Sequence, residues 1–274
     1  MAAAEVGDVT AWHSHLDVFG VVIALVVAYE YGLRTLRARY APRGEPAITR
    51  SRRFAYYAGV GLLFIVSSWP IHDIGDRSLF LFHMVEHLTI ALAVPPLLIW
   101  GTPWWLLRAL LRPVLPVLEI LTKPFVALFV FNAVLGLLHV PAVVELMLTS
   151  GLFHFALHAA LFVTAVLMWF PVLNPIPDLP RLAPFPKMGY LFLQSLVPTI
   201  PASFLTLGDT ALYPIYETFP RLWGISPHTD QVLAGLVMKI GGGLALWSAI
   251  AAVFFRWYAE EQRVDRPTVG EPQR

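Results

Sequence analysis

Seven long apolar runs dominate the sequence and decide what it can fold into. They occupy residues 16–36, 54–71, 79–100, 125–140, 151–173, 189–207 and 231–256. A helix of about 20 apolar residues crosses the roughly 30 Å of hydrocarbon in a bilayer. With 57% hydrophobic and only 14% charged residues, a chain of 274 residues does not form a water-soluble globule. We therefore expect an all-α, polytopic membrane helix bundle with seven transmembrane helices.

The connections between the runs are too short to contain a soluble catalytic domain. We expect residues 1–262 to form a single transmembrane domain and residues 263–274, which lack large apolar side chains, to form a disordered cytoplasmic tail. The sequence contains no cysteine. Disulfides and thiolate ligands are therefore excluded, and a metal site has to use histidine, methionine or carboxylate side chains.

The lysine and arginine residues predict the orientation in the membrane. Of the 19 basic residues, 16 lie in the connections on one side or after the last run, whereas the connections on the other side carry only Arg77 and Arg221. Basic residues are concentrated in the cytoplasmic loops of membrane proteins. We therefore expect the N-terminus outside and the C-terminus in the cytoplasm, as an odd number of spans requires.

Proline and tryptophan residues mark the predicted ends and breaks of the helices. Pro95 and Pro96 are expected to close the third span, and Pro198 and Pro201 to kink or partly unwind the sixth. Because amphipathic rings prefer the membrane interface, tryptophans near span ends, Trp169 among them, are expected to anchor the helices there.

Two of the predicted helices each carry a histidine pair whose members are one helical turn apart. His83 and His87 lie in the third run, and His154 and His158 lie in the fifth. Residues four apart share one helix face and lie about 6 Å apart along its axis. Both pairs begin near the predicted outer end of their helix, so they share one depth. Because burying an imidazole without a partner is costly, four at one depth favour a metal site over separately packed side chains.

Further metal-binding residue types lie at the same predicted end of the bundle. His139 ends the fourth run on the outer side, and Asp230 and Met238 lie at the outer start of the seventh. Imidazole suits copper, zinc and iron, and the thioethers of Met84 and Met238 favour Cu(I).

Glu86 and Lys239 are ionisable residues inside the predicted hydrocarbon region. They lie at similar depths in the third and seventh runs. The two side chains are therefore candidates for a buried ion pair. The alternative is that Lys239 extends to water.

Other interpretations use the same histidines. The residues from His83 to His87 match the H-x-x-E-H pattern, in which two histidines bind zinc and Glu86 would act as a general base. That interpretation leaves His154 and His158 unexplained. A b-type haem would use only one histidine from each helix. In a metal-free scaffold, the histidines would only pack between helices.

The order of these motifs resembles that of a known family. The stretch His83-Met84-Val85-Glu86-His87-Leu88, followed by Pro95-Pro96-Leu97-Leu98-Ile99-Trp100-Gly101-Thr102-Pro103, is similar to the H-M-x-x-H…P-P-L-L-x-x-G-x-P signature of the membrane-embedded cytochrome c oxidase assembly factor CtaG family. The resemblance continues with His139-Val140-Pro141, the helix of His154 and His158, Leu212-Tyr213-Pro214-Ile215-Tyr216 and Asp230-Gln231-Val232-Leu233-Ala234-Gly235-Leu236-Val237-Met238.

The resemblance implies copper delivery to the CuB centre of a haem-copper cytochrome c oxidase in the bacterial plasma membrane. In this role the chain is a metallochaperone and not an enzyme. The expected primary copper ligands are His83, His87, His154 and His158, and the expected exchange ligands are His139 and Met238. Glu86 is expected to accept a hydrogen bond or balance charge, and Met84, Asp230 and Lys239 are expected to surround the site.

The same resemblance implies the partners. They are the lipid bilayer, the catalytic subunit of the oxidase and an extracytoplasmic protein that donates copper, and no nucleic acid is expected. The alternatives are a haem- or zinc-binding membrane enzyme that uses the same histidine cluster, or a metal-free assembly scaffold. The sequence assigns no role to His13, His15, His72 and His228.

Overall fold

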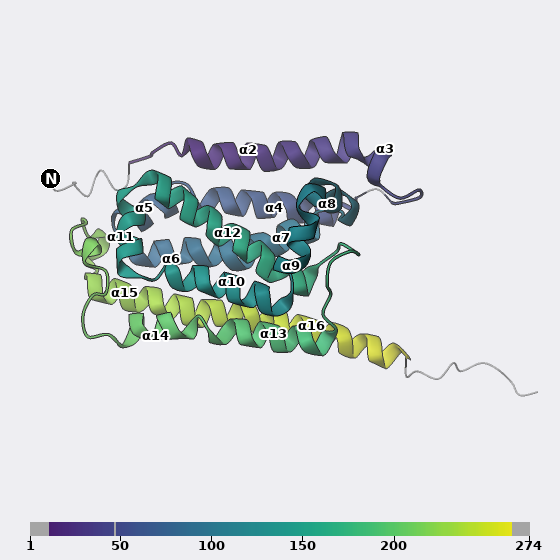
Figure 1. Ribbon diagram of the computed structural model, residues 1–274. Coiled ribbons are helices and arrows are strands. Elements are labelled where there is room, and N and C mark those ends of the chain that lie inside the picture. Colours follow the sequence, from purple (N-terminus) through teal and green to yellow (C-terminus); the bar gives the residue numbers. More distant parts are fainter. Residues whose placement is uncertain (1–10, 47, 265–274) are drawn as a thin grey trace, which may run out of the picture.

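The computed structural model describes residues 11–46 and 48–264, and every regular element in these residues is a helix. The long helices run side by side in one bundle (Figure 1). Helix α2 (Leu16–Tyr31) lies along one edge and packs on α4 (Arg50–Val66). Helices α13 (Pro184–Leu196) and α16 (Gly242–Val264) pack together along the opposite edge. The expected all-α class is confirmed.

The other helices fill the bundle and its two ends. In the first half of the chain they are α3 (Arg37–Tyr40), α5 (Ile71–Arg77), α6 (Phe80–Leu88), α7 (Val94–Gly101), α8 (Trp104–Leu111) and α9 (Leu115–Leu121). In the second half they are α10 (Pro124–Leu137), α11 (Pro141–Thr149), α12 (Gly151–Leu173), α14 (Thr199–Leu207) and α15 (Pro227–Leu236). Wide π-helical turns are η1 (Gly32–Leu36), η2 (Thr89–Ala93) and η6 (Val237–Gly241), and tight 3-10 turns are η3 (Arg112–Val114), η4 (Pro214–Glu217) and η5 (Leu222–Gly224).

Six continuous helical stretches are long and apolar enough to cross a membrane. They are Leu16–Tyr40, Arg50–Arg77, Phe80–Gly101, Gly151–Leu173, Pro184–Leu207 and Pro227–Arg263. Each contains one of the predicted spans or matches it closely. The chain is therefore a membrane protein whose apolar outer side chains contact lipid.

The predicted fourth span differs from the other six. Helix α10 has only 14 residues, because Pro124 starts it and the chain turns before Pro141 starts α11. It makes a seventh membrane-spanning unit only together with Trp104–Leu121, from which it is bent by 93°. The described residues thus provide six spans, or seven if this bent pair counts as one.

The sequence suggested that Pro95 and Pro96 close the third span. They do not, because the helix continues past them as α7. A proline has no N–H and its ring crowds the carbonyl four residues back, so the helix widens into η2 just before them. The carbonyl of Ala91, which Pro95 cannot satisfy, accepts a hydrogen bond of 3.0 Å from the indole Nε1 of Trp169. Trp169 is buried, so it bridges helices and is not the interface anchor that was expected.

The sixth span breaks where prolines were expected to break it, since α13 ends at Leu196 and α14 begins at Thr199. At the C-terminal end, α16 continues to Val264, so the first residues of the predicted tail are helical. Residues 265–274 of that tail lie outside the described residues.

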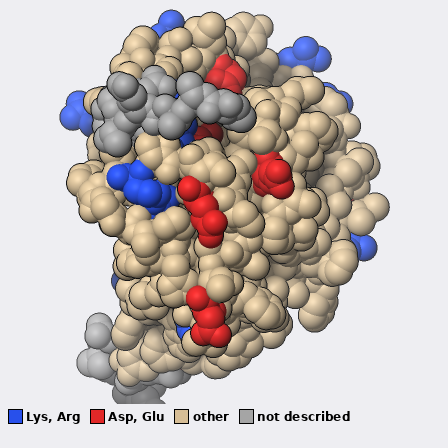
Figure 2. Space-filling model, turned by 90° about the vertical axis from the view of Figure 1, so that its left-hand side faces the viewer, with Lys and Arg blue, Asp and Glu red and all other residues tan. Residues whose placement is uncertain are grey.

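The two ends of the bundle carry different residues. Helices α3, α8 and α9 lie at one end, and α5, α11 and the first turns of α6 and α12 lie at the other (Figure 1). The first end holds a concentration of basic residues: Arg37, Arg39, Arg50, Arg52, Arg53, Arg108 and Arg112. Figure 2 looks onto the second end, where a few charged side chains are scattered over a mostly uncharged surface. The four predicted primary ligands belong to the helices of this second end.

The segment between α14 and α15 ties the second end together. The hydroxyl of Tyr213 donates a hydrogen bond to the carbonyl oxygen of His139 at 3.1 Å, and that of Tyr216 donates to the carbonyl oxygen of Gly75 at 2.9 Å. Burial raises the pKa of both tyrosines, which keeps their hydroxyls protonated and able to donate.

Candidate metal centre

The predicted histidine pairs of α6 and α12 meet at one place, and the short helix α5 completes the cluster. Helix α5 approaches α6 so closely that a Cβ added at Gly75 would lie 2.8 Å from the backbone nitrogen of His83. Only glycine permits this approach. It brings His72 and Asp76, which lie one turn apart on α5, beside the histidines of α6.

Glu86 is the first of two carboxylates that orient the cluster. It is fully buried. Its Oε2 lies 2.9 Å from Nδ1 of His72, and its Oε1 lies 3.4 Å from Nδ1 of His158. One carboxylate therefore joins α5, α6 and α12, and the two imidazoles offset the cost of burying its charge.

Asp76 is the second carboxylate, at the edge of the same cluster. Its Oδ1 lies 3.4 Å from Nδ1 of His83, and its Oδ2 lies 3.3 Å from Nδ1 of His154. The same Oδ2 lies 3.5 Å from Nε2 of His72. Asp76 thus contacts imidazoles from the same three helices as Glu86 does.

These contacts determine which ring nitrogens can bind a metal. An imidazole nitrogen that faces a carboxylate carries the proton and donates it, so the other nitrogen keeps its lone pair. In His83, His154 and His158 the nitrogen facing a carboxylate is Nδ1, which leaves Nε2 as the ligand atom. The Nε2 of His154 is buried without a hydrogen-bond partner, so its lone pair is available to a metal. Metal-binding histidines in proteins are usually held by a carboxylate in this way.

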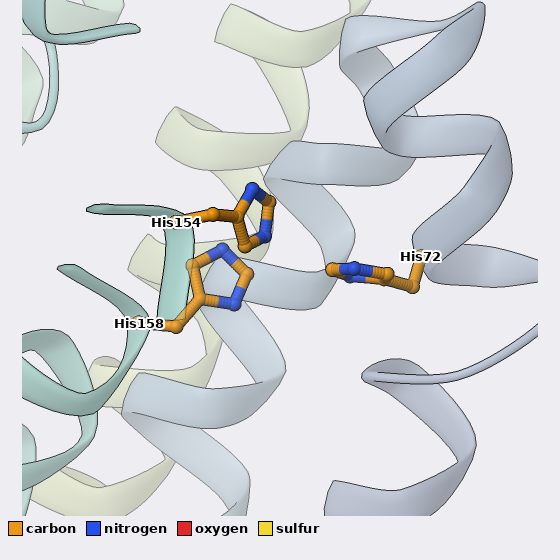
Figure 3. Close-up of side chains that lie close together, drawn as sticks. All are labelled: His72, His154 and His158. Atoms are coloured by element: carbon orange, nitrogen blue, oxygen red, sulfur yellow. The ribbon is translucent and has the colours of Figure 1, made fainter. Parts of the chain in front are cut away.

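The histidines form two overlapping groups of three, each with ligand nitrogens within 4.8 Å of one another. The α5 triad consists of His72, His154 and His158. In Figure 3, the two α12 histidines face His72 across the gap between their helices. The α6 triad consists of His83, His87 and His158. His158 belongs to both triads.

The spacing of the ligand atoms fits a metal ion. The Nε2 atoms of His87 and His158 lie 3.0 Å apart. Two nitrogens bound to one tetrahedral ion at 2.0–2.1 Å are about 3.3 Å apart. A small rotation of either ring therefore places both nitrogens on one ion. Without the metal, Nε2–H of His87 donates to the lone pair of His158, so binding replaces one proton between the two rings.

Two cavities adjoin the cluster. The first, of about 130 Å³, is lined by the α5 triad together with residues of α2, α4 and α12. The second, of about 40 Å³, is lined by Met84, His87, His139, Met238 and mostly apolar neighbours. The contact between His87 and His158 connects the walls of the two cavities.

The structure brings together the four predicted primary ligands and Glu86, and it leaves the other predicted site residues outside the two triads. Met84, His139 and Met238 line the second cavity and belong to neither triad. Asp230 instead holds the first turn of α6: its carboxylate accepts hydrogen bonds from the backbone N–H groups of Phe80 at 2.8 Å and Leu81 at 2.9 Å. It also pairs with Arg221 at 2.8 Å.

The expected pair of Glu86 and Lys239 is not formed. Glu86 contacts His72 and His158, whereas Lys239 is exposed and forms no ion pair among the described residues. Glu86 points towards α5 and α12. Lys239 borders the second cavity.

Sequence reasoning missed His72 as a ligand and Asp76 as its partner. The signal was present, because the two residues lie four apart in a segment with a further carboxylate, Asp73. Ending the second span at residue 71 placed this segment in a loop. The structure continues it as α5, inside the helical stretch Arg50–Arg77.

Two further histidines lie at the rim of the cluster. His13 Nδ1 and His15 Nε2 lie 3.3 and 3.1 Å from the carboxylate of Asp73. The ring of His15 meets that of His72 edge to face, with centroids 4.8 Å apart. His228 lies elsewhere, with its Nε2 donating to the carbonyl oxygen of Gly208 at 2.8 Å.

Comparison with known proteins identifies the family of the chain. Two uncharacterized proteins, one from Mycobacterium bovis and one from Mycobacterium tuberculosis, are each 22% identical over 280 residues, covering 93% of this chain. The chain spans only 40% of the length of these relatives. No solved structure matches it. The sequence model of one family, the cytochrome c oxidase caa3 assembly factors (Caa3_CtaG), matches residues 27–260. The chain therefore belongs to the CtaG family of cytochrome c oxidase assembly factors.

Proposed function

We propose that this assembly factor carries copper to the CuB centre of a haem-copper cytochrome c oxidase and that the α5 and α6 triads hold the ion on the way. The observation that carries the proposal is the shared orientation of the histidines. Asp76 and Glu86 face the Nδ1 atoms of His83, His154 and His158, whose Nε2 atoms remain for a metal, whereas both ring nitrogens of His72 face a carboxylate. Such prior orientation serves metal binding and is not required for packing.

The overlap of the two triads suits a carrier. A carrier has to bind its ion and release it to a partner. Because His158 is shared, an ion can move from the α5 triad to the α6 triad by exchanging the other two ligands while one bond is kept. Neutral imidazoles exchange more readily than thiolates, and the two carboxylates balance the charge of the ion.

The position of the cluster supports delivery on the outer side of the bacterial plasma membrane. The histidines lie at the end of the bundle opposite the concentration of basic residues (Figure 1). By the positive-inside rule, we expect the basic end to face the cytoplasm and the N-terminus and the cluster to lie outside. A copper donor outside the cytoplasm and the catalytic subunit of the oxidase are the partners that this position suits.

The geometry favours a carrier over the enzymes considered from the sequence. A zinc protease needs Glu86 to activate a water molecule, but Glu86 is fully buried and contacts two imidazoles. A haem needs room between its two histidine ligands, but the rings of the cluster are packed together, such as His83 and His87 with centroids 4.1 Å apart. The adjoining cavities are much smaller than a porphyrin.

The proposal is tested in cells that lack this protein. The haem-copper oxidase should then assemble with its haems but without CuB, and the wild-type gene should restore the metal. The variant His154→Ala should be inserted in the membrane but restore little CuB. His228→Ala, which changes a histidine outside the cluster, should restore it fully. Full CuB occupancy in cells without the protein would refute the delivery role.

A further inference from the structure

We infer that the second cavity is a separate binding site for a soft monovalent cation, Cu(I), whose ligands are His139, Met84 and Met238. We call these three residues the thioether site. The inference extends the proposed function, since it gives copper a second position beyond the triads.

The clearest sign of a ligand is on His139. Its Nδ1 donates a hydrogen bond of 2.7 Å to the carbonyl oxygen of Leu135, so its Nε2 carries the lone pair. That Nε2 is buried and has no hydrogen-bond partner, although the residue lines the cavity. Leaving a buried polar atom unsatisfied costs about 1–3 kcal/mol, so such an atom calls for an explanation. A metal ion in the cavity provides one.

The two thioethers line the same cavity as His139. Met84 and Met238 are each 3% exposed and belong to one packed cluster that also contains Tyr213. The hydroxyl of Tyr213 holds the backbone carbonyl of His139. A third methionine, Met168, lines the cavity but packs in a different cluster. The structure therefore associates Met84 and Met238, and not Met168, with the unpartnered imidazole.

The charges around the cavity favour a monovalent ion. Among the described residues that line it there is no aspartate or glutamate, and the only ionised group at its edge is the cation Lys239. A divalent ion would have no negative partner there. Thioether and imidazole ligands are neutral and soft, which suits Cu(I). The volume of about 40 Å³ is sufficient for one ion and a water molecule.

The site is placed to receive an ion from the triads. His87 lines the second cavity, and its Nε2 lies 3.0 Å from His158, the residue common to both triads. Rotation of the His87 ring from His158 towards the second cavity would carry an ion from the imidazole cluster to the thioethers. The ion remains Cu(I) throughout, so no oxidant or reductant is required.

The test uses purified full-length protein in detergent, titrated anaerobically with Cu(I) and, separately, with Ag(I). The wild-type protein should bind two ions per chain, and X-ray absorption of the copper-loaded protein should show both nitrogen and sulfur ligands. The double variant Met84→Leu/Met238→Leu should bind one ion with nitrogen ligands only. His158→Ala should retain one ion with sulfur ligands. The matched control Met168→Leu should behave as wild type.

The outcomes separate this inference from the proposed function. A wild-type protein that binds one ion without sulfur ligands overturns the thioether site and leaves the triads. Two ions bound by the double methionine variant, or loss of sulfur ligands in Met168→Leu, also overturns it. A wild-type protein that binds neither cation overturns both the thioether site and copper carriage.

Discussion

The two cavities beside the histidine cluster lie next to each other but present different ligands. The first is bordered by the α5 triad, whose imidazoles contact the carboxylates Asp76 and Glu86. The second contains thioethers, one unpartnered imidazole and no carboxylate among its described lining residues. On the first side, ligand orientation is set by side-chain charges. On the second side, it is set by a backbone carbonyl and by apolar packing.

For the copper carriage that we propose, this difference separates two requirements, capture and release. Carboxylate-oriented imidazoles are ready for an ion before it arrives, which favours capture. Thioethers without a charged partner hold a soft ion less rigidly, which favours release. Changes on the first side should therefore alter copper affinity strongly, and changes on the second should alter it less.

The largest effect is expected for His158→Ala. Because His158 belongs to both triads, its removal leaves neither with three ligands, and the remaining pairs hold copper weakly. Copper held with nitrogen ligands only should fall to background in metal analysis after competition with a chelator. As a control for folding, the variant should insert into the membrane at the wild-type level. Retention of that copper would show that the triads are not the binding site.

Removing the carboxylate charges should have the next largest effect. Glu86→Gln and Asp76→Asn keep the shape of the side chain but remove its charge and replace one accepting oxygen by an NH2 donor, so at least one imidazole N–H loses its acceptor. Changes to such partners typically reduce metal affinity about 10–100-fold. Competition titration with a chromophoric copper chelator measures the change. Glu145→Gln, on the exposed face of α11 at the same end, is the matched control. Equal affinities for all three variants and wild type would refute the orienting role.

A smaller effect on affinity, with a clear effect on stability, is expected for Gly75→Ala. The new Cβ meets the backbone of α6 at His83, so α5 has to move away and take Asp76 with it. Overpacking of this kind costs about 1–3 kcal/mol. Thermal unfolding in detergent should show a lower midpoint, with weaker copper binding. Gly61→Ala, where a Cβ meets nothing within 4 Å, should be neutral or stabilising. If both variants unfold alike, the close approach does not control the cluster.

The smallest effect is expected for Tyr213→Phe. This change removes the hydrogen bond to the carbonyl of His139 and should cost about 1 kcal/mol of stability. It should weaken Cu(I) binding at the thioether site and leave binding at the triads unchanged. Isothermal titration with Cu(I) distinguishes binding at the thioether site from binding at the triads. The control is Tyr31→Phe, which changes an exposed tyrosine of α2. An equal loss at both sites would mean that the cavities do not differ as described.

Local sequence patterns predicted the features that depend on local spacing. The apolar runs predicted helices at nearly the observed bounds, and the four-residue spacing of His83 with His87 and of His154 with His158 placed each pair on one helix face. Depth counted from the predicted ends was sufficient to bring the two pairs together. These features follow from the rise and period of a helix, which a single sequence contains.

Contacts that depend on how helices turn towards each other were not predictable in this way. Glu86 and Lys239 were predicted to lie at similar depths, but depth does not specify which neighbour a side chain faces. His72 and Asp76 enter the cluster only because Gly75 lets α5 touch α6. Trp169 is buried where its indole N–H donates to the carbonyl of Ala91, which Pro95 cannot satisfy. The preference of tryptophan for the ends of membrane spans does not predict such a contact.

The central claim is that copper binds between α5, α6 and α12 on ring nitrogens of the histidine triads, through Nε2 in His83, His154 and His158. Diffraction from crystals of the copper-loaded protein, recorded above and below the copper absorption edge, tests it most directly. The account predicts an anomalous peak within bonding distance of His158 and two further cluster histidines, with Asp76 and Glu86 still facing the Nδ1 atoms. A copper peak elsewhere in the molecule, with the histidine cluster free of metal, would contradict it.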